Sequence, residues 1–384
     1  MKRIKNGLAR MLGGPHGALW GSVLSVVLTL LTAGLLLLIM GKNPLTAFYS
    51  FLQGCGMAPK AKYGGGSGMI ADLMDFLNFL TPMLLASLAF IVGFKVGLFN
   101  IGIAGQMMLS GFLAMVLVGY NKALPAGAAR PLVILVGAVA GGLMGALIGF
   151  LKYRFNIHEV VSTIMVNYII SYTTGFFINT NYLDMMTRNS RVCQPHARLT
   201  LTKVPIGGMK CVVPLGLVIA LVAVAAVWFL FSRMTMGFEL RAVGLNPHCA
   251  RYFGVNVGKS IMMSMAISGV LAGLAGVTYY LGYTNSIVPK TLVGMGYDSI
   301  SVALLGNASP IGAVFAAIIV SIFQQGANYM SSTMGVAREI SSLITGIMLL
   351  YASCGGYMRT LAENHLRRIV RAGSTDNPGE VKKP

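Results

Sequence analysis

Long apolar segments alternate with short polar connections along almost the whole chain. A helical run of about 20 apolar residues crosses a hydrocarbon core about 30 Å thick. Ten segments have this character, and we predict that each crosses or partly crosses a membrane. They cover residues 19–40, 70–93, 98–119, 131–151, 160–180, 212–231, 260–282, 296–306, 308–327 and 338–354. The pattern predicts an all-α integral membrane protein with about ten transmembrane helices.

The stretch from Gly93 to Gly111 interrupts this pattern. It reads GFKVGLFNIGIAGQMMLSG and sets an asparagine, a glutamine and five glycines between two apolar segments. Unpaired backbone groups are costly in lipid, so a glycine-broken polar stretch at membrane depth must be buried in protein or line a water-filled path. We interpret this stretch as part of a translocation route.

A second break lies in the other half of the chain. Segment 296–306, GYDSISVALLG, is short, polar and bounded by glycines. We expect it and segment 98–119 to form broken or half-helices. One such segment in each half is typical of a transporter whose site lies near the midplane between two related halves. The two halves are only loosely related, because no strict sequence repeat joins them.

Amide side chains mark the candidate pathway. Asn100 and Gln106 offer both donors and acceptors, which suit neutral polar solutes such as sugars and nucleosides. Asn167 and Asp298 are costly if they face lipid. Each of these side chains can instead tie two helices together, and the sequence leaves both roles open. The candidate pathway residues are Phe99, Asn100, Gly102, Gln106, Asn167 and Asp298. We expect Asn100→Leu to impair uptake more than assembly.

The composition supports a membrane protein. Of the 384 residues, 55% are hydrophobic and only 10% are charged, against about 25% charged in soluble domains. Little chain remains for a soluble domain. The predicted organisation is a cytoplasmic segment at 1–18, a transmembrane domain at 19–354 and a cytoplasmic tail at 355–384.

The net charge is +19, and the basic residues are spread among loops and tails rather than gathered on one face. We therefore expect them to set the orientation of the chain in the membrane rather than to bind nucleic acid. Lys2, Arg3, Lys5 and Arg10 precede the first segment, which indicates a cytoplasmic N-terminus. Ten crossings return the C-terminus to the same side. The basic residues then placed in the cytoplasm are Lys152, Arg154, Arg233, Arg241, Arg251, Lys259, Arg359, Arg367, Arg368 and Arg371. The fit is partial, since others then lie outside: Lys42, Lys60, Lys62, Arg188, Arg191, Arg198, Lys203 and Lys210.

The loop 233–259 is the longest polar stretch on the proposed cytoplasmic side. We predict a helical turn at 239–243, an end at Gly244 and the Asn246-Pro247 step, and a second short helix from Pro247 to Tyr252. It resembles a docking element, although a basic loop that only fixes orientation fits the same composition. Its Gly-Lys-Ser end is not a Walker A loop, because Phe253 stands where that motif has glycine. If the protein depends on ATP, another chain must bind it.

Other residues narrow the function classes. The five cysteines and five histidines show no metal-ligand spacing, and we predict no metal, cofactor or catalytic site. Cys193 and Cys211 can pair if their loop faces an oxidising compartment. Glycines at 137, 141, 145 and 149 create a bare helix face, for which internal packing is favoured over a subunit interface. A stand-alone ion-coupled carrier is the alternative function, but Asp298 and Lys95 are the ionisable groups that we can name for it.

The sequence resembles the permease subunits of ATP-binding-cassette importers for nucleosides and simple sugars, in the branched-chain permease superfamily. GLFNIGIAGQ is similar to their GLFNIGxEGQ motif, and three further stretches agree in order: NIHEVVSTIMVNYI from Asn156, RAVGLNPHCARYFGV from Arg241 and GYDSISVALLG from Gly296. Two departures stand out. Ala104 replaces the usual glutamate, and His158 is inserted before Glu159.

The resemblance implies a subunit without enzymatic activity in the cell membrane. Its partners would be a second related permease, two ATPase subunits and an extracytoplasmic solute-binding lipoprotein. Loop 233–259 would sit in a cleft of the ATPase and drive alternating access. The candidate coupling residues are Glu239, Arg241, Gly244, Asn246 and Arg251. Neither the resemblance nor the amides separate nucleosides from sugars, or a homodimeric from a heterodimeric permease.

Overall fold

The computed structural model describes residues 17–60, 68–206 and 209–335, with further positions between 339 and 364. The predicted N-terminal segment falls outside this range except for residues 17 and 18. The predicted tail falls outside it except for residues 360 and 364, so the orienting basic residues at both ends are not described. The tenth predicted segment, 338–354, is helical at the positions that are described.

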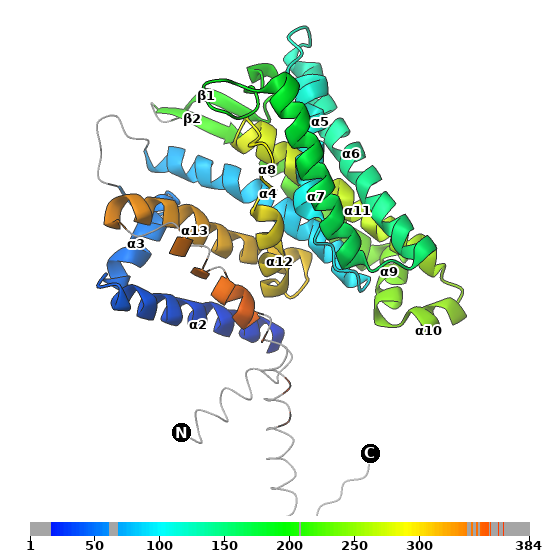
Figure 1. The fold of residues 1–384 in the computed structure, drawn as a ribbon. Coiled ribbons are helices and arrows are strands. Elements are labelled where there is room, and N and C mark those ends of the chain that lie inside the picture. Colours follow the sequence, from blue (N-terminus) through cyan, green and yellow to red (C-terminus); the bar gives the residue numbers. More distant parts are fainter. Residues whose placement is uncertain are drawn as a thin grey trace, which may run out of the picture.

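The chain is a bundle of helices with one small hairpin (Figure 1). The helices are α2 (Gly17–Ile39), α3 (Pro44–Gly54), α4 (Met69–Lys95), α5 (Ile103–Ala114), α6 (Ala126–Phe155), α7 (Glu159–Phe177), α8 (Gly216–Arg233), α9 (Thr235–Leu245), α10 (Pro247–Tyr252), α11 (Val257–Thr278), α12 (Met295–Leu305) and α13 (Pro310–Met334). Turns of π-helix extend three of them, at Met115–Gly119, Ile178–Tyr182 and Tyr279–Tyr283.

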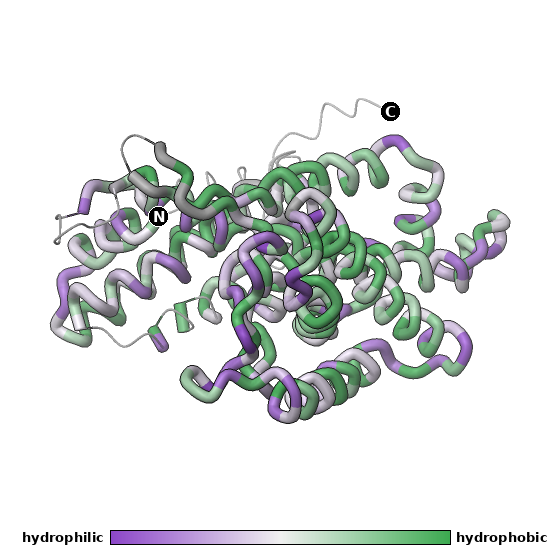
Figure 2. Tube along the Cα trace, turned by 90° about the horizontal axis from the view of Figure 1, so that it is seen from above, coloured by the Kyte–Doolittle hydropathy of each residue, from purple (hydrophilic) through white to green (hydrophobic). Residues whose placement is uncertain are grey.

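Seven helices within the described residues are long and apolar enough to cross a membrane. The third and eighth predicted segments are shorter, as expected: the corresponding apolar helices are Ile103–Gly119 and Met295–Leu305. Figure 2 shows hydrophobic residues along the outer helices, with hydrophilic residues gathered in the connections. The all-α membrane fold is therefore confirmed. The sequence missed α3, which begins where Asn43 caps the backbone N–H of Leu45.

A repeated order of elements relates the two halves. A long helix, a break, a short helix and another long helix occur as α4, residues 96–102, α5 and α6, and again as α11, residues 284–294, α12 and α13. Helices α4 and α11 pack in opposite directions. The amide of Asn78 bonds the Gly282 carbonyl, whereas the hydroxyl of Ser268 bonds the Ala89 carbonyl. The repeat is thus inverted, as in many transporter folds.

The glycine face of α6 packs inside the subunit, which confirms the favoured alternative. A Cβ built on Gly141 would collide with the carbonyl oxygen of Gly269 on α11, and one built on Gly145 with the carbonyl oxygen of Met265. Along the same face, a Cβ built on Gly137 would lie 3.3 Å from the Gly273 carbonyl oxygen, and one built on Gly149 would lie 2.9 Å from the Cα of Met262. Without side chains between them, the two backbones approach closely.

A hairpin and a long loop cover one end of the bundle. Strands β1 (Thr200–Ile206) and β2 (Met209–Pro214) pair antiparallel, with Thr200 opposite Pro214. The preceding loop is tied to the segment after α11, because the N–H of Cys193 bonds the Asn285 carbonyl at 3.0 Å. The sequence predicted no strand here. Cys193 and Cys211 are buried free thiols, so the disulfide considered from their spacing is absent between these two described residues.

Helices α9 and α10 lie at the opposite end of the bundle from the hairpin (Figure 1). The end of α6 and the start of α11 meet there, since Tyr153 covers Gly258. Lys152 pairs with Glu159 at 2.8 Å and closes the turn between α6 and α7 at this same end. Six of the basic residues predicted to be cytoplasmic are therefore on one side: Lys152, Arg154, Arg233, Arg241, Arg251 and Lys259.

Candidate solute pathway and docking face

The break after α4 turns around Gly97, whose φ of +80° favours glycine. The chain then reaches Asn100, which is completely buried. Its amide nitrogen donates to Ser268 Oγ at 2.9 Å and to Gln106 Oε1 at 3.3 Å, and its amide oxygen accepts from the N–H of Gly102 at 3.0 Å. One side chain thus joins the break to α5 and α11.

Asn167 on α7 holds the start of α5 from the other side. Its amide oxygen accepts from the N–H of Gly105 at 2.9 Å, which satisfies one of the free donors in the first turn of α5. Its amide nitrogen donates to the Ile101 carbonyl at 3.1 Å and to the Tyr297 hydroxyl at 3.4 Å. Asn167 therefore links the break, α7 and α12.

The remaining predicted pathway residues divide into packing and polar groups. Phe99 is half-buried, and its ring packs edge-on against Phe90 at 4.9 Å. Gly102 leaves room for Thr163, whose Cβ would lie 3.1 Å from a Cβ built there. Asp298 is half-buried in the first turn of α12, and its carboxylate accepts from Gln324 Nε2 at 2.7 Å.

The structure brings most of these residues together but turns the two central amides inward. Asn100 and Gln106 are both 0% exposed, and Gln106 Nε2 has no hydrogen-bond partner among the described residues. This arrangement ties helices together, which is the role that the sequence left open. Contact with a passing solute stays a prediction for the half-buried Asp298, whereas Asn100, Gln106 and Asn167, which are all buried, would need another conformation to make it.

Several contributing residues escaped the sequence analysis. Ser268, Tyr297 and Gln324 complete the polar contacts of Asn100, Asn167 and Asp298. All three lie in helices, at least 26 residues along the chain from their partners. A lone polar residue in an apolar helix was the available signal, but its partner depends on the fold.

The predicted short helices in loop 233–259 are confirmed. Helix α10 spans Pro247–Tyr252 as predicted, because the Asn246 side chain caps the N–H groups of His248 and Cys249. Helix α9 is longer than the predicted turn and runs from Thr235 to Leu245.

The exposed side chains of α9, α10 and Phe253, which follows α10, form a surface that we call the docking face. Large apolar residues stand out on it: Leu245, Tyr252 and Phe253 are 88%, 92% and 87% exposed. The candidate coupling residues Glu239, Arg241 and Arg251 are exposed beside them, whereas Asn246 serves as the α10 cap. An apolar patch rimmed by charges is typical of a protein-binding surface.

Gly244 fixes this face to the break. A Cβ built on Gly244 would collide with the Lys95 carbonyl oxygen and would lie 3.1 Å from the carbonyl carbon of Val96. Gly244 therefore packs directly against the last turn of α4, which ends at Lys95, two residues before Gly97. No side chain lies between the two backbones at this contact, so α9 and the last turn of α4 pack directly against each other.

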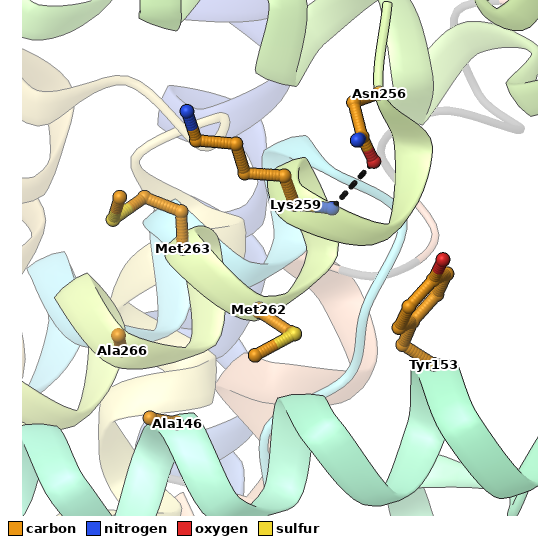
Figure 3. A pocket seen from close by; sticks show the side chains of 7 residues that line it. All are labelled: Ala146, Tyr153, Asn256, Lys259, Met262, Met263 and Ala266. Carbon is orange, nitrogen blue, oxygen red and sulfur yellow. Dashed lines mark hydrogen bonds between the residues drawn. The ribbon is translucent and has the colours of Figure 1, made fainter.

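A separate cavity of about 390 Å³ lies between α6 and α11 (Figure 3). Mostly apolar side chains line it, including Tyr153, Met262 and Met263. Asn256 at its rim caps α11 by accepting from the N–H of Lys259 at 3.0 Å (Figure 3). The Gly-Lys-Ser sequence thus forms the first turn of a long apolar helix. None of the six predicted pathway residues lines this cavity.

Comparisons with known proteins identify the family of this chain. The family described as "Branched-chain amino acid transport system / permease component" matches residues 73–353. The guanosine ABC transporter permease protein NupP of Bacillus subtilis is 35% identical over 86% of this chain and 92% of its own length. The nucleoside ABC transporter permease protein NupB of Lactococcus lactis is 31% identical over 86% and 89%. The glucose ABC transporter permease protein TsgB13 of Haloferax volcanii is 25% identical over 86% and 85%. No solved structure matches the chain.

Proposed function

The chain belongs to the permease family of the branched-chain amino acid transport system, and from this premise we propose that it is the membrane-spanning subunit of an ATP-driven importer of nucleosides. The names of two relatives with more than 30% identity support nucleosides as the solute. A glucose permease among the relatives keeps simple sugars as the second solute class.

Coupling to separate ATPase subunits is supported by the contact of Gly244 with the Lys95 backbone. The docking face offers exposed apolar groups and charges to a partner. An ATPase that moves this face would move the last turn of α4 and, through it, the break that carries Asn100. This contact is the observation on which the proposed coupling rests.

Alternating access follows from the same connection. Asn100 and Asn167 hold the break and the start of α5 in one arrangement. ATP binding that displaces α9 would exchange these hydrogen bonds for others and open the pathway to the opposite side. The solute would enter from the side of the hairpin, delivered by a binding lipoprotein, and leave on the side of the docking face. A second related permease would complete the pathway.

The orientation is part of the proposal. Six basic residues gather at the end that carries the docking face, as the positive-inside rule requires of a cytoplasmic side. The loop that contains Arg188, Arg191 and Arg198 would then face outward, where the lipoprotein docks. We propose cytoplasmic N- and C-termini on the same reasoning.

The test is reconstitution. The tagged chain should co-purify with a protein that carries Walker motifs, and proteoliposomes that hold this complex should import guanosine only when ATP and the lipoprotein are both present. Import by the chain alone, driven by an ion gradient without ATPase, would instead identify a stand-alone carrier and overturn the proposal.

A further inference from the structure

Helix α7 exposes tyrosines in the middle of its span. The helix and its π-turn cover Glu159–Tyr182, and this span has the lowest hydropathy, 1.3, of the seven candidates in the described part of the chain. Tyr168 and Tyr172 are 57% and 62% exposed, one helical turn apart on the same face. Thr173 is exposed beside them.

Other outward faces of the bundle differ in this respect. The middle of α6 exposes Leu135, Val139 and Leu143, and the first half of α8 exposes Val218 and Val222. These are side chains that lipid accepts at the bilayer centre. Tyrosine prefers the membrane–water interface, because its hydroxyl finds no partner among acyl chains. Helix α7 also exposes apolar side chains, among them Met165, Ile169 and Phe176. The two exposed tyrosines at mid-span nevertheless indicate that the strip of α7 that carries them does not contact lipid.

Tyr297 of α12 belongs to the same surface. It is 41% exposed, and its hydroxyl lies 3.4 Å from the Asn167 amide nitrogen, next in sequence to Tyr168. The segment before α12 also runs along α7, since a Cβ on Gly175 would lie 3.1 Å from the Lys290 nitrogen. Two elements thus contribute to one aromatic surface.

We propose that Tyr168, Tyr172 and Tyr297 form a wall of the solute pathway on which the base of a nucleoside stacks. The inference rests on the proposed function and adds the residues that select the solute. Stacking on an aromatic ring tolerates every base, because each base has a π-face. Such a wall suits an importer of nucleosides, because a free pentose has no base that could stack on the tyrosine rings.

The wall is connected to the docking face. Behind Tyr297, Asn167 bonds the N–H of Gly105 at the start of α5. That start follows the break, whose other end carries the contact between Lys95 and Gly244. A movement of α9 can therefore reach the wall through main-chain contacts and one amide. The buried network supports the wall, and the tyrosines meet the solute.

Accessibility tests the wall directly. Tyr172→Cys is placed in a Cys249→Ser, Cys354→Ser background, which removes the two cysteines exposed in the described chain. In the complete transport complex, a water-soluble methanethiosulfonate should modify the cysteine introduced at position 172. Guanosine, added with the lipoprotein and ATP, should slow this modification. Leu143→Cys on α6 is the matched control, and only a lipid-phase photoreactive probe should label it.

Two outcomes would overturn the wall. Labelling of position 172 only by the lipid-phase probe would place it against acyl chains. Failure of both reagents would place it in a permanent protein contact. Either result can occur in a complex that imports guanosine normally, so the wall can fail while the proposed function stands.

Substitution provides a second measurement. Tyr172→Phe keeps the ring, and guanosine uptake should stay within about threefold of the unmodified complex, whereas Tyr172→Leu should lower it about 5- to 150-fold through lost stacking. Ribose uptake, where present, should change much less. Phe229→Leu on the exposed face of α8 is the control for loss of a ring at a lipid-facing site. Equal guanosine uptake by Tyr172→Leu and Tyr172→Phe would contradict base stacking.

Discussion

Ala104 and Gly296 meet where the two half-helices begin. A Cβ built on Gly296 would lie 2.7 Å from the nitrogen, Cα and Cβ of Ala104, so the first turns of α5 and α12 touch through their backbones. Both helix starts carry partial positive charge. Ala104, which is completely buried, is also the position where the resemblance expects glutamate.

This contact predicts that Gly296→Ala destabilises the subunit. The added methyl group has no space, and overpacking of this kind costs about 1–3 kcal/mol. Gly127→Ala in α6 is the control, because its Cβ would have no neighbour within 4 Å. The thermal unfolding midpoint of the purified subunit should fall for the first variant and hold or rise for the second. Equal midpoints would show that the two half-helices separate freely.

The hydrogen bonds of Asn100 predict that Asn100→Leu impairs assembly as well as uptake. The substitution removes three bonds and leaves the Gly102 N–H unpaired in a buried site, at a cost of about 1–3 kcal/mol. This differs from the expectation based on sequence alone, in which uptake suffers more. Yield of folded complex and guanosine uptake should both be measured. Normal yield with lost uptake would restore the solute-contact role of Asn100.

Substitutions on the docking face should abolish coupling to the ATPase without changing the stability of the folded subunit. Glu239→Ala with Arg241→Ala should abolish solute-stimulated ATP hydrolysis, because both exposed side chains lie on the face proposed to meet the ATPase. The thermal unfolding midpoint of the isolated subunit should not change. Lys122→Ala, an exposed residue in the loop between α5 and α6, is the control. Stimulation that survives the double substitution would count against the assigned role of α9.

The cysteines give one prediction about the reactivity of the Cys193 thiol and one about the side of the membrane on which Cys249 lies. Burial raises the pKa of the Cys193 thiol to about 11, although Arg198 nearby opposes the shift. Because the thiolate is the reactive form, folded protein should leave Cys193 unlabelled by maleimide even at about pH 9, while the exposed Cys249 reacts. In a Cys354→Ser variant, a membrane-impermeant maleimide should label inside-out vesicles and spare right-side-out ones. The reverse pattern would invert the proposed topology.

Local sequence predicted the short helices of the docking face well. Asn246 and Pro247 end one helix and start the next through caps and ring geometry that act within four residues. The two breaks were also predicted, because glycines and polar residues within apolar segments are visible without a fold. The hairpin at 200–214 was missed, and its last residues, 212–214, were assigned to the predicted segment 212–231, which begins as α8 only at Gly216. The start of the hairpin is held by a distant contact, because the N–H of Leu199 bonds the Leu281 carbonyl.

The candidate site was predicted only in part. The amides were identified, but their direction was not, because Asn100 bonds Ser268 at 168 residues' distance along the chain. The glycine face of α6 was recognised, and its partner on α11 was not. Tyr168 and Tyr172 had no special signal, as tyrosines in an apolar helix are unremarkable until one knows which face is outside and at what depth.

The sequence by itself determined that this chain is a helical membrane protein with two interrupted segments and a short helical pair between spans. Those features follow from the free energy of moving residues and backbone from water into lipid, which depends on each segment alone. The tertiary structure decided that Asn100 points inward, that Gly244 rests on Lys95, and that the tyrosines of α7 face away from the core. Each of these depends on which distant segment supplies the neighbouring atoms, and helical periodicity carries no information about that choice.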